Sequence, residues 1–244
     1  MDSVTPLLGT IAPVFTLPCI DPQDPSRTQV SLDDYRGRWL ILVFYPRDFS
    51  MVCPTELTGL SQRHKDFEEL GCSILGVSCD SVEAHRKWIE TPRSRGGLGG
   101  LNFPLASDAD GTVATRYRVF SPWQRVAQRG LFILDPNAVV QYKVVHSMSV
   151  GRRADEVLRV LAALQTGGLC AEDWTSGDST LSPDRVIGPG SVVAHFQIEK
   201  TIGRGSFATV FAALDTKLHR RVALKVLKPE SRSHSETLIA EARA

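Results

Sequence analysis

Apolar residues in the first two thirds of the chain alternate between strand-like and helix-like arrangements. Residues 38–46, RWLILVFYP, and residues 72–78, CSILGVS, are nearly continuous apolar runs, as expected for strands that are buried on both faces. Residues 55–71 lie between these runs and predict a helix that ends at a glycine. The apolar positions of this helix are Leu57, Leu60, Phe67 and Leu70.

The alternation continues after the second strand. Residues 82–90 predict a second helix, and residues 131–135 and 139–146 predict a hairpin that turns at Pro136 and Asn137. Residues 154–165 have a strong helical period and predict a closing helix. Together these elements predict a thioredoxin-like α/β sandwich, in which a central mixed sheet has helices on both faces.

The composition changes after Trp174. Residues 175–190, TSGDSTLSPDRVIGPG, are rich in Ser, Gly, Pro and Asp and poor in large apolar residues, which is typical of linkers. Short β-like runs return from Phe196 onward. We therefore expect an α/β domain over residues 1–174, a linker over 175–195 and a small β-rich domain over 196–244.

Length and charge narrow the class of protein. A chain of 244 residues has room for one domain of about 150–200 residues and a smaller one. A net charge of +1 gives no electrostatic indication of a nucleic-acid or membrane partner. The longest apolar run, residues 39–45, is far shorter than the ~18 residues of a membrane span, and the first residues carry no basic leader. We expect a cytoplasmic protein without either partner.

Cys53 is the cysteine with the most informative surroundings. Pro54 in a first helical turn would place Cys53 at a helix N-terminus, where N–H groups and the helix dipole favour a thiolate. Ser50 offers a hydroxyl to a bound oxygen, and Pro46 lacks an N–H and can exclude water from the sulfur. The alternative interpretation is that Cys53 is a small core hydrophobe beside the strand.

The residues around Cys53 resemble the peroxidatic site of the peroxiredoxins. The pattern of that family is Pro, three residues, Thr or Ser, two residues, Cys, and Pro46, Ser50 and Cys53 match it. Similar segments follow in order between residues 5 and 181. They are VCPTE at 52–56, GVS at 76–78, HRKWIETPR at 85–93, FPL at 103–105, RGLFI at 129–133 and VGR at 150–152.

This resemblance implies a thiol peroxidase that reduces hydrogen peroxide and small alkyl hydroperoxides. Cys53 would attack the peroxide and become a sulfenic acid, while Ser50 and Arg129 would stabilise the developing charge. Glu56 would orient Arg129 and Arg152. For each arginine the alternative is a solvated surface charge.

Cys170, in GGLCAEDW, lies where the typical two-cysteine group of this family carries its resolving cysteine. The resemblance implies that Cys170 of one subunit attacks the Cys53 sulfenate of its partner in a homodimer, which could join a ring of dimers. A thioredoxin-like protein would reduce the disulfide. The helix start at Cys53 must unwind first, and slow unwinding would allow a second peroxide to form sulfinic acid.

Two further features bear on this cycle. The run GGLG at 96–99 resembles a loop of oxidation-sensitive members, but their Tyr-Phe segment has no counterpart after Trp174, so we expect a robust enzyme. His64, His85 and His146 lack metal-ligand spacing. Because sulfur would carry the chemistry, we expect no metal and no organic cofactor for the peroxidase. The other three cysteines are expected to be structural, because Cys72 and Cys79 flank a buried strand and Cys19 lies in a polar loop with no activating neighbour.

Residues 201–227 resemble the opening of a Ser/Thr protein kinase. The glycine-rich loop over ATP would contain Gly203, Gly205, Ala208 and Val210; the strand with the phosphate-binding lysine would contain Ala223 and Lys225; and Glu241 would pair with that lysine. The alternative is that the two glycines mark a hairpin. This resemblance implies a kinase N-lobe fragment that could bind ATP without kinase activity, because the aspartates of the second lobe are missing. The chain would then be a peroxide sensor or the front end of a kinase fusion.

Overall fold

The computed structural model describes residues 7–181, 187–205 and 208–227. The chain divides into two compact units, Met1–Leu161 and Ala162–Ala244. This division places residues 162–174 with the second unit. The domain limits expected from the sequence, after residues 174 and 195, stay predictions, and Glu241 lies outside the described residues.

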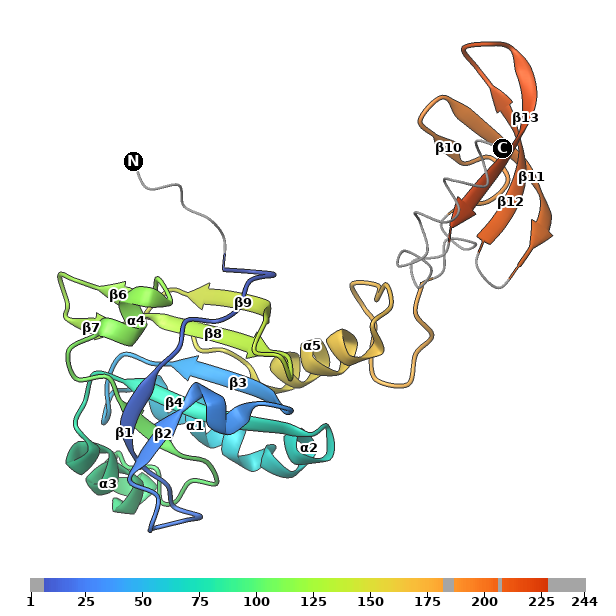
Figure 1. Ribbon diagram of the computed structural model, residues 1–244. Helices are drawn as coiled ribbons and strands as arrows, with labels where there is room; N and C mark the ends of the chain where they lie inside the picture. Colours follow the sequence, from blue (N-terminus) through green and yellow to red (C-terminus); the bar gives the residue numbers. More distant parts are fainter. Residues whose placement is uncertain (1–6, 182–186, 206–207, 228–244) are drawn as a thin grey trace. The chain divides into compact units, whose positions relative to one another are not determined.

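A seven-stranded mixed sheet forms the centre of the first unit, in the order β2-β1-β5-β4-β3-β8-β9 (Figure 1). Strands β3, β4 and β5 are parallel to one another, and the other pairs are antiparallel. The strands are β1 Thr16–Ile20, β2 Gln29–Ser31, β3 Trp39–Phe44, β4 Cys72–Ser78, β5 Leu105–Ser107, β8 Arg129–Leu134 and β9 Val140–His146. The predicted mixed sheet and the β8–β9 hairpin are confirmed.

The helices expected from the sequence occur in the predicted order, with two differences: the first expected helix is divided, and α4 was not predicted. The helices of this unit are α1 Cys53–Gln62, α2 His64–Glu69, α3 Val82–Glu90, α4 Thr112–Arg116 and α5 Ala154–Thr166, with short 3-10 turns at Leu32–Tyr35 and Arg93–Arg95 and a small hairpin of β6 Phe120–Ser121 and β7 Val126–Ala127. The single helix expected over 55–71 is instead two helices, because the backbone of Arg63 (φ −96°, ψ 9°) interrupts the helical geometry. In the described residues, no helix is long and apolar enough to cross a membrane.

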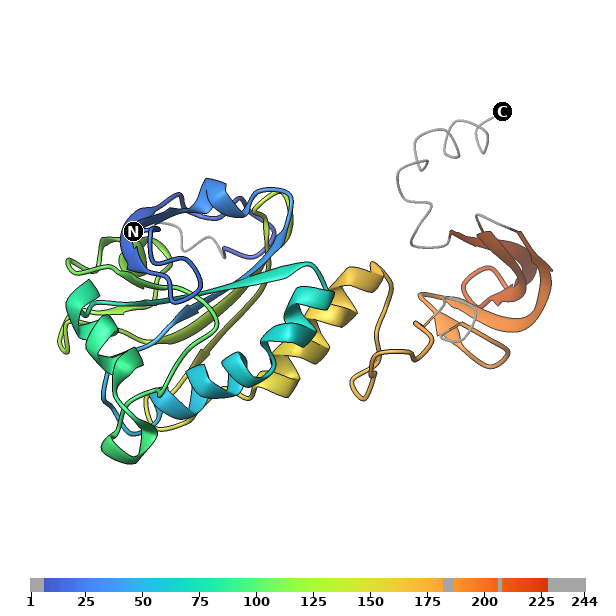
Figure 2. The same ribbon diagram turned by 90° about the horizontal axis from the view of Figure 1, so that it is seen from below.

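Side chains of β3 alternate between the two faces of the sheet, and helices cover both faces. Leu40, Leu42 and Phe44 belong to a core that includes Val113 of α4 and Tyr117, the residue that follows α4. The opposite face carries α1, α2 and α5, which lie side by side (Figure 2). A Cβ at Gly59 of α1 would lie 3.8 Å from the Ala154 Cβ of α5, so these helices pack closely. The predicted thioredoxin-like sandwich is confirmed.

The second unit contains a four-stranded antiparallel sheet. Its strands, in spatial order, are β10 Val192–Val193, β11 Phe196–Arg204, β12 Ala208–Asp215 and β13 Arg220–Leu227. The sheet curves around a small core of Ile198, Phe211 and Ala213. The prediction of a β-rich second part is confirmed, whereas its kinship with kinases stays a prediction.

Candidate active site

Cys53 is the first residue of α1, and its side chain is fully buried. The helix can begin there because Pro54 stands in its first turn, where the fixed φ of proline suits a helix and its missing N–H costs no hydrogen bond. The residue before the helix, Val52, provides no side-chain cap. The sulfur therefore lies at the positive end of the helix dipole, as predicted.

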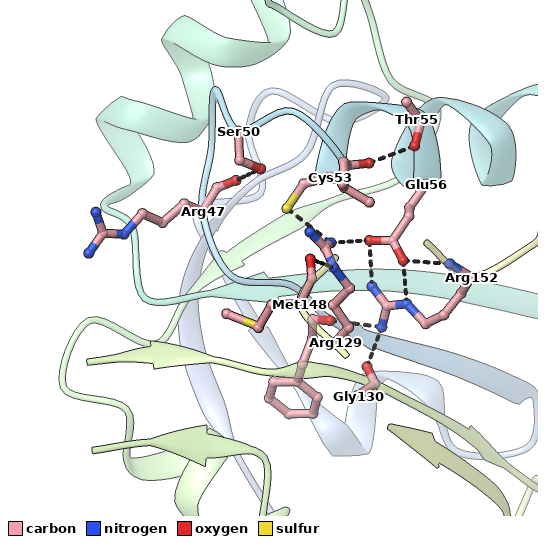
Figure 3. A network of polar contacts seen from close by, with 11 residues as sticks. Arg47, Ser50, Cys53, Thr55, Glu56, Arg129, Gly130, Met148 and Arg152 are labelled. Carbon is pink, nitrogen blue, oxygen red and sulfur yellow. Dashed lines mark hydrogen bonds and ion pairs between the residues drawn. The ribbon is translucent and has the colours of Figure 1, made fainter. Parts of the chain in front are cut away.

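Arg129, the first residue of β8, places a cation beside the sulfur. Its Nη1 donates to Cys53 Sγ over 3.3 Å and to Glu56 Oε2 over 2.6 Å (Figure 3). Its Nε donates to the carbonyl of Met148 over 2.8 Å, which fixes the plane of the guanidinium. A buried cationic donor at this distance stabilises negative charge on the sulfur or on an oxygen bound to it.

Glu56 joins this arginine to a second one. Both carboxylate oxygens accept from Arg152: Oε1 from Nε over 2.7 Å and Oε2 from Nη2 over 3.0 Å. The backbone N–H of Arg152 also donates to Oε1, over 2.8 Å. The remaining donor, Nη1 of Arg152, reaches the carbonyls of Phe44 and Gly130 over 2.8 and 2.7 Å. Arg129 and Arg152 are only 3% and 7% exposed, so neither is a solvated surface charge.

Pro46 and Ser50 lie on the loop between β3 and α1. Pro46 is buried, and Ser50 is partly buried. The Ser50 hydroxyl donates to the carbonyl of Arg47 over 3.0 Å and forms part of a local turn. The structure therefore brings Cys53, Glu56, Arg129 and Arg152 into one hydrogen-bonded cluster and places Ser50 on its approach. A role of Ser50 toward a peroxide stays a prediction.

Cys170 belongs to the second unit and is partly buried. Its sulfur lies 3.5 Å from the Thr166 hydroxyl and 3.7 Å from the carbonyl of Ala163, both at the end of α5. All five cysteines are free thiols in this structure. Cys170 is therefore available for disulfide formation.

The other three cysteines are held in environments that disfavour the thiolate. Burial raises the pKa of Cys72 to about 12, and burial, followed by the nearby Asp108 carboxylate, raises the pKa of Cys79 to about 11. Burial also raises the pKa of Cys19. These side chains stay protonated near neutral pH, in keeping with structural roles. Within the described ranges, no group of three or more His, Cys, Asp or Glu side chains could hold a metal ion.

The structure contains a second buried polar cluster beside the same loop, which the sequence analysis did not predict. It pairs Asp48 with His85 of α3. The available signal was a charged residue, Asp48, within the apolar stretch before Cys53. The burial of His85 depends on strand β5, which has no clear pattern of its own in the sequence.

The fold and the cysteine–arginine–glutamate cluster define a thiol-based oxidoreductase of the thioredoxin-like class. Comparisons with known proteins make this class specific. The profile of the AhpC/TSA family matches residues 8–143. The chain therefore belongs to this family, the peroxiredoxins, and is a peroxidase.

Relatives and solved structures agree with this membership. A protein of the rubredoxin operon of Clostridium pasteurianum, described as a peroxiredoxin, is 48% identical over 72% of this chain and 98% of its own length. The chloroplastic 2-Cys peroxiredoxin of Hordeum vulgare is 42% identical over 73% of this chain and 87% of its own length. The reduced 2-Cys peroxiredoxin of Plasmodium vivax has a TM-score of 0.71 and 32% identity, and the match covers 75% of this chain and 96% of that chain.

Proposed function

We propose that this protein reduces hydrogen peroxide and small alkyl hydroperoxides through a two-cysteine cycle that begins at Cys53. The thiolate attacks the distal peroxide oxygen, the O–O bond breaks, and the sulfur is oxidised to a sulfenic acid. The proximal oxygen leaves with the electron pair and takes a proton to become water or an alcohol. The observation that carries this proposal is the 3.3 Å hydrogen bond from Arg129 to the Cys53 sulfur.

The cluster around that bond suits this chemistry. Arg129 is positioned to stabilise charge on both the attacking sulfur and the departing oxygen, and Glu56 with Arg152 holds its guanidinium in place. Pro46 excludes water from the site, and the Ser50 hydroxyl bonds the incoming peroxide after turning from Arg47. Complete burial of the sulfur favours small hydroperoxides over bulky ones.

The second half of the cycle uses Cys170. Its thiol attacks the Cys53 sulfenic acid of a partner subunit, which forms an intersubunit disulfide and releases water. A thioredoxin-like dithiol then reduces this disulfide. Support comes from the free, partly exposed state of Cys170 and from relatives whose names record two cysteines. Because Cys53 is buried at the start of α1, the first turn of this helix has to unwind before the two sulfurs meet.

One equivalent of hydrogen peroxide tests this cycle. We expect the reduced protein to form a covalent dimer on a non-reducing gel, with peptide mass mapping locating a Cys53–Cys170 cross-link. The Cys170→Ser variant should stay monomeric on the gel and accumulate oxidised Cys53, whereas Cys79→Ser, the matched control, should behave like the unmodified chain. Oxidation of Cys53 without a Cys170 cross-link would restrict the protein to a one-cysteine peroxidase or a peroxide sensor.

We also propose, as a second candidate function, that the β11–β13 sheet binds the phosphates of ATP, as in the front end of a kinase. The supporting observation is the strand register, which pairs Val210 of β12 with Lys225 of β13 and so puts both on one sheet face. Gly203 and Gly205 lie where β11 turns toward β12, and the N–H of Gly205 donates to the Ala208 carbonyl over 2.8 Å. Ala223 lies on the same strand as the lysine.

Titration of the full chain with Mg-ATP tests this second function. A lysine that bonds a phosphate contributes about 1.5–3 kcal/mol, so Lys225→Ala should raise the Kd at least tenfold. Lys217→Ala, in the turn between β12 and β13, is the matched control and should leave the Kd unchanged. If the unmodified chain binds no ATP at millimolar concentration, the glycines serve only the turn.

A further inference from the structure

The loop that leads to Cys53 is tied to the rest of the first unit by a buried, hydrogen-bonded pair of side chains, Asp48 and His85. Asp48 Oδ2 lies 2.8 Å from His85 Nδ1, and the two side chains are 3% and 0% exposed. The Tyr45 hydroxyl donates to Asp48 Oδ1 over 2.9 Å. The other ring nitrogen of His85, Nε2, lies 3.3 Å from the Ala106 carbonyl of β5. One loop carboxylate thus connects the end of β3 to α3 and, through His85, to β5.

The loop backbone is held at the same point. The N–H of Asp48 donates to Asp80 Oδ2 over 2.9 Å, and the Ser78 hydroxyl donates to the same oxygen. The ring of the next residue, Phe49, packs on Trp88 of α3 with 6.2 Å between centroids. Phe49 also adopts a positive φ of 54°, which redirects the chain at the end of the tied part.

The residues that follow make few side-chain hydrogen bonds to distant parts of the chain. Side-chain hydrogen bonds of residues 50–55 stay within the segment's immediate neighbours, and the one exception in the described part of the chain is the Arg129 bond to Cys53. Firm attachment resumes at Glu56, which both arginines hold. Cys53 therefore lies on a short segment with few long-range side-chain hydrogen bonds, between two buried anchors.

We infer that the Asp48–His85 pair is a positioning device: it anchors the upstream end of the segment that unwinds around Cys53, and it sets how oxidised Cys53 divides between disulfide and sulfinic acid. This inference rests on the proposed peroxidatic role of Cys53. Five residues span at most roughly 17 Å when extended, so the start of α1 can unwind while Asp48 stays bound. The anchor limits the unwound segment to residues after Asp48. It also speeds the refolding of this segment into the first turn of α1.

The anchor at Asp48 affects how much oxidised Cys53 becomes disulfide and how much becomes sulfinic acid. In the folded site, the sulfenic acid can meet a second peroxide, which transfers one oxygen to give sulfinic acid and leaves as water or an alcohol. In the unwound state, the sulfur is exposed to the resolving thiol instead. A firm anchor favours the folded site, and loss of the anchor shifts the population toward the unwound state.

Variants of the pair test the inference. In Asp48→Asn and His85→Gln, sulfinic acid formed per turnover, measured by intact mass after rapid mixing with hydrogen peroxide, should fall about threefold to tenfold, and Cys53 oxidation should slow. The double variant should match the stronger single variant, because both changes remove one interaction. Tyr45→Phe removes only the hydroxyl that donates to Asp48, so it should shift the product ratio in the same direction by a smaller factor. This milder variant keeps the inference testable if a variant of the pair does not fold.

Asp108→Asn is the matched control. Asp108 is a carboxylate 1% exposed whose side chain accepts from the N–H groups of Val113 and Ala114 and not from the loop before Cys53. It should lower the melting temperature without changing the product ratio. The inference is wrong if the loop variants, Tyr45→Phe included, lower the melting temperature but keep the ratio of sulfinic acid to disulfide of the unmodified chain. It is also wrong if the effects of the two single variants multiply in the double variant. If Cys53 of the unmodified chain is not oxidised at all, the proposed function fails and the inference with it.

Discussion

Replacement of Cys53 by serine is expected to lower kcat/KM for hydrogen peroxide by at least about 10⁴-fold, the scale of loss seen when a nucleophile is removed. A serine hydroxyl stays protonated near neutral pH, and its oxygen cannot accept the peroxide oxygen as a sulfur does. The hydrogen bond between Arg129 and Glu56 would remain, but the site would have no sulfur to oxidise.

Peroxide consumption in the presence of excess dithiol reductant measures this loss. Cys79→Ser is the matched control, because its thiol has a pKa of about 11 and lies outside the cluster, so its kcat/KM should stay within twofold of the unmodified value. Retention of more than a hundredth of the activity in Cys53→Ser would place the peroxide chemistry at another residue.

Replacement of Glu56 by glutamine should cost about 3–5 kcal/mol of the first unit's unfolding free energy, because it leaves two buried guanidinium groups without their counter-charge. Glu56 is 3% exposed and receives hydrogen bonds from Arg129 and from Arg152. Loss of the carboxylate should also slow Cys53 oxidation by about 10²–10³-fold, since Arg129 would no longer be held beside the sulfur.

Chemical denaturation and stopped-flow oxidation of the same samples separate these two effects. Glu83→Gln is the matched control: Glu83 is 85% exposed and 3.9 Å from Arg86, so its loss should cost less than about 1 kcal/mol. Equal destabilisation by the two substitutions would show that the buried carboxylate contributes no more than a surface charge.

Much of the fold follows from local pattern. Strands β3 and β4 are continuous apolar runs, and α3 has both a helical period and a capping serine, Ser81, whose hydroxyl accepts from the N–H of Ala84. The short strands β1, β2 and β5 were not predicted. They hold only three to five residues each, and what makes them strands is pairing with partners far along the chain, such as Cys19 with Ala106.

The site residues, too, divide into those that local sequence predicts and those that it does not. The chemistry of Cys53 can be argued from its local neighbours Pro46, Ser50 and Pro54, whereas the role of Glu56 was implied by the resemblance. Nothing local distinguishes Arg129 or Arg152 among the 28 basic residues; only the resemblance selected them. Their burial depends on Glu56 and on backbone carbonyls of β3 and β8, which become neighbours when the sheet forms.

The sequence separations within this cluster determine how long after Cys53 its partners are synthesised. Arg129 follows Cys53 by 76 positions, and Arg152 follows Glu56 by 96. A ribosome needs roughly 5–20 s to add 96 residues, at about 5–20 residues per second. During that interval the hydrogen-bonded cluster of Cys53, Glu56, Arg129 and Arg152 is incomplete. If Cys53 has the proposed peroxidatic role, the site that this role needs is assembled only when the first unit is nearly complete.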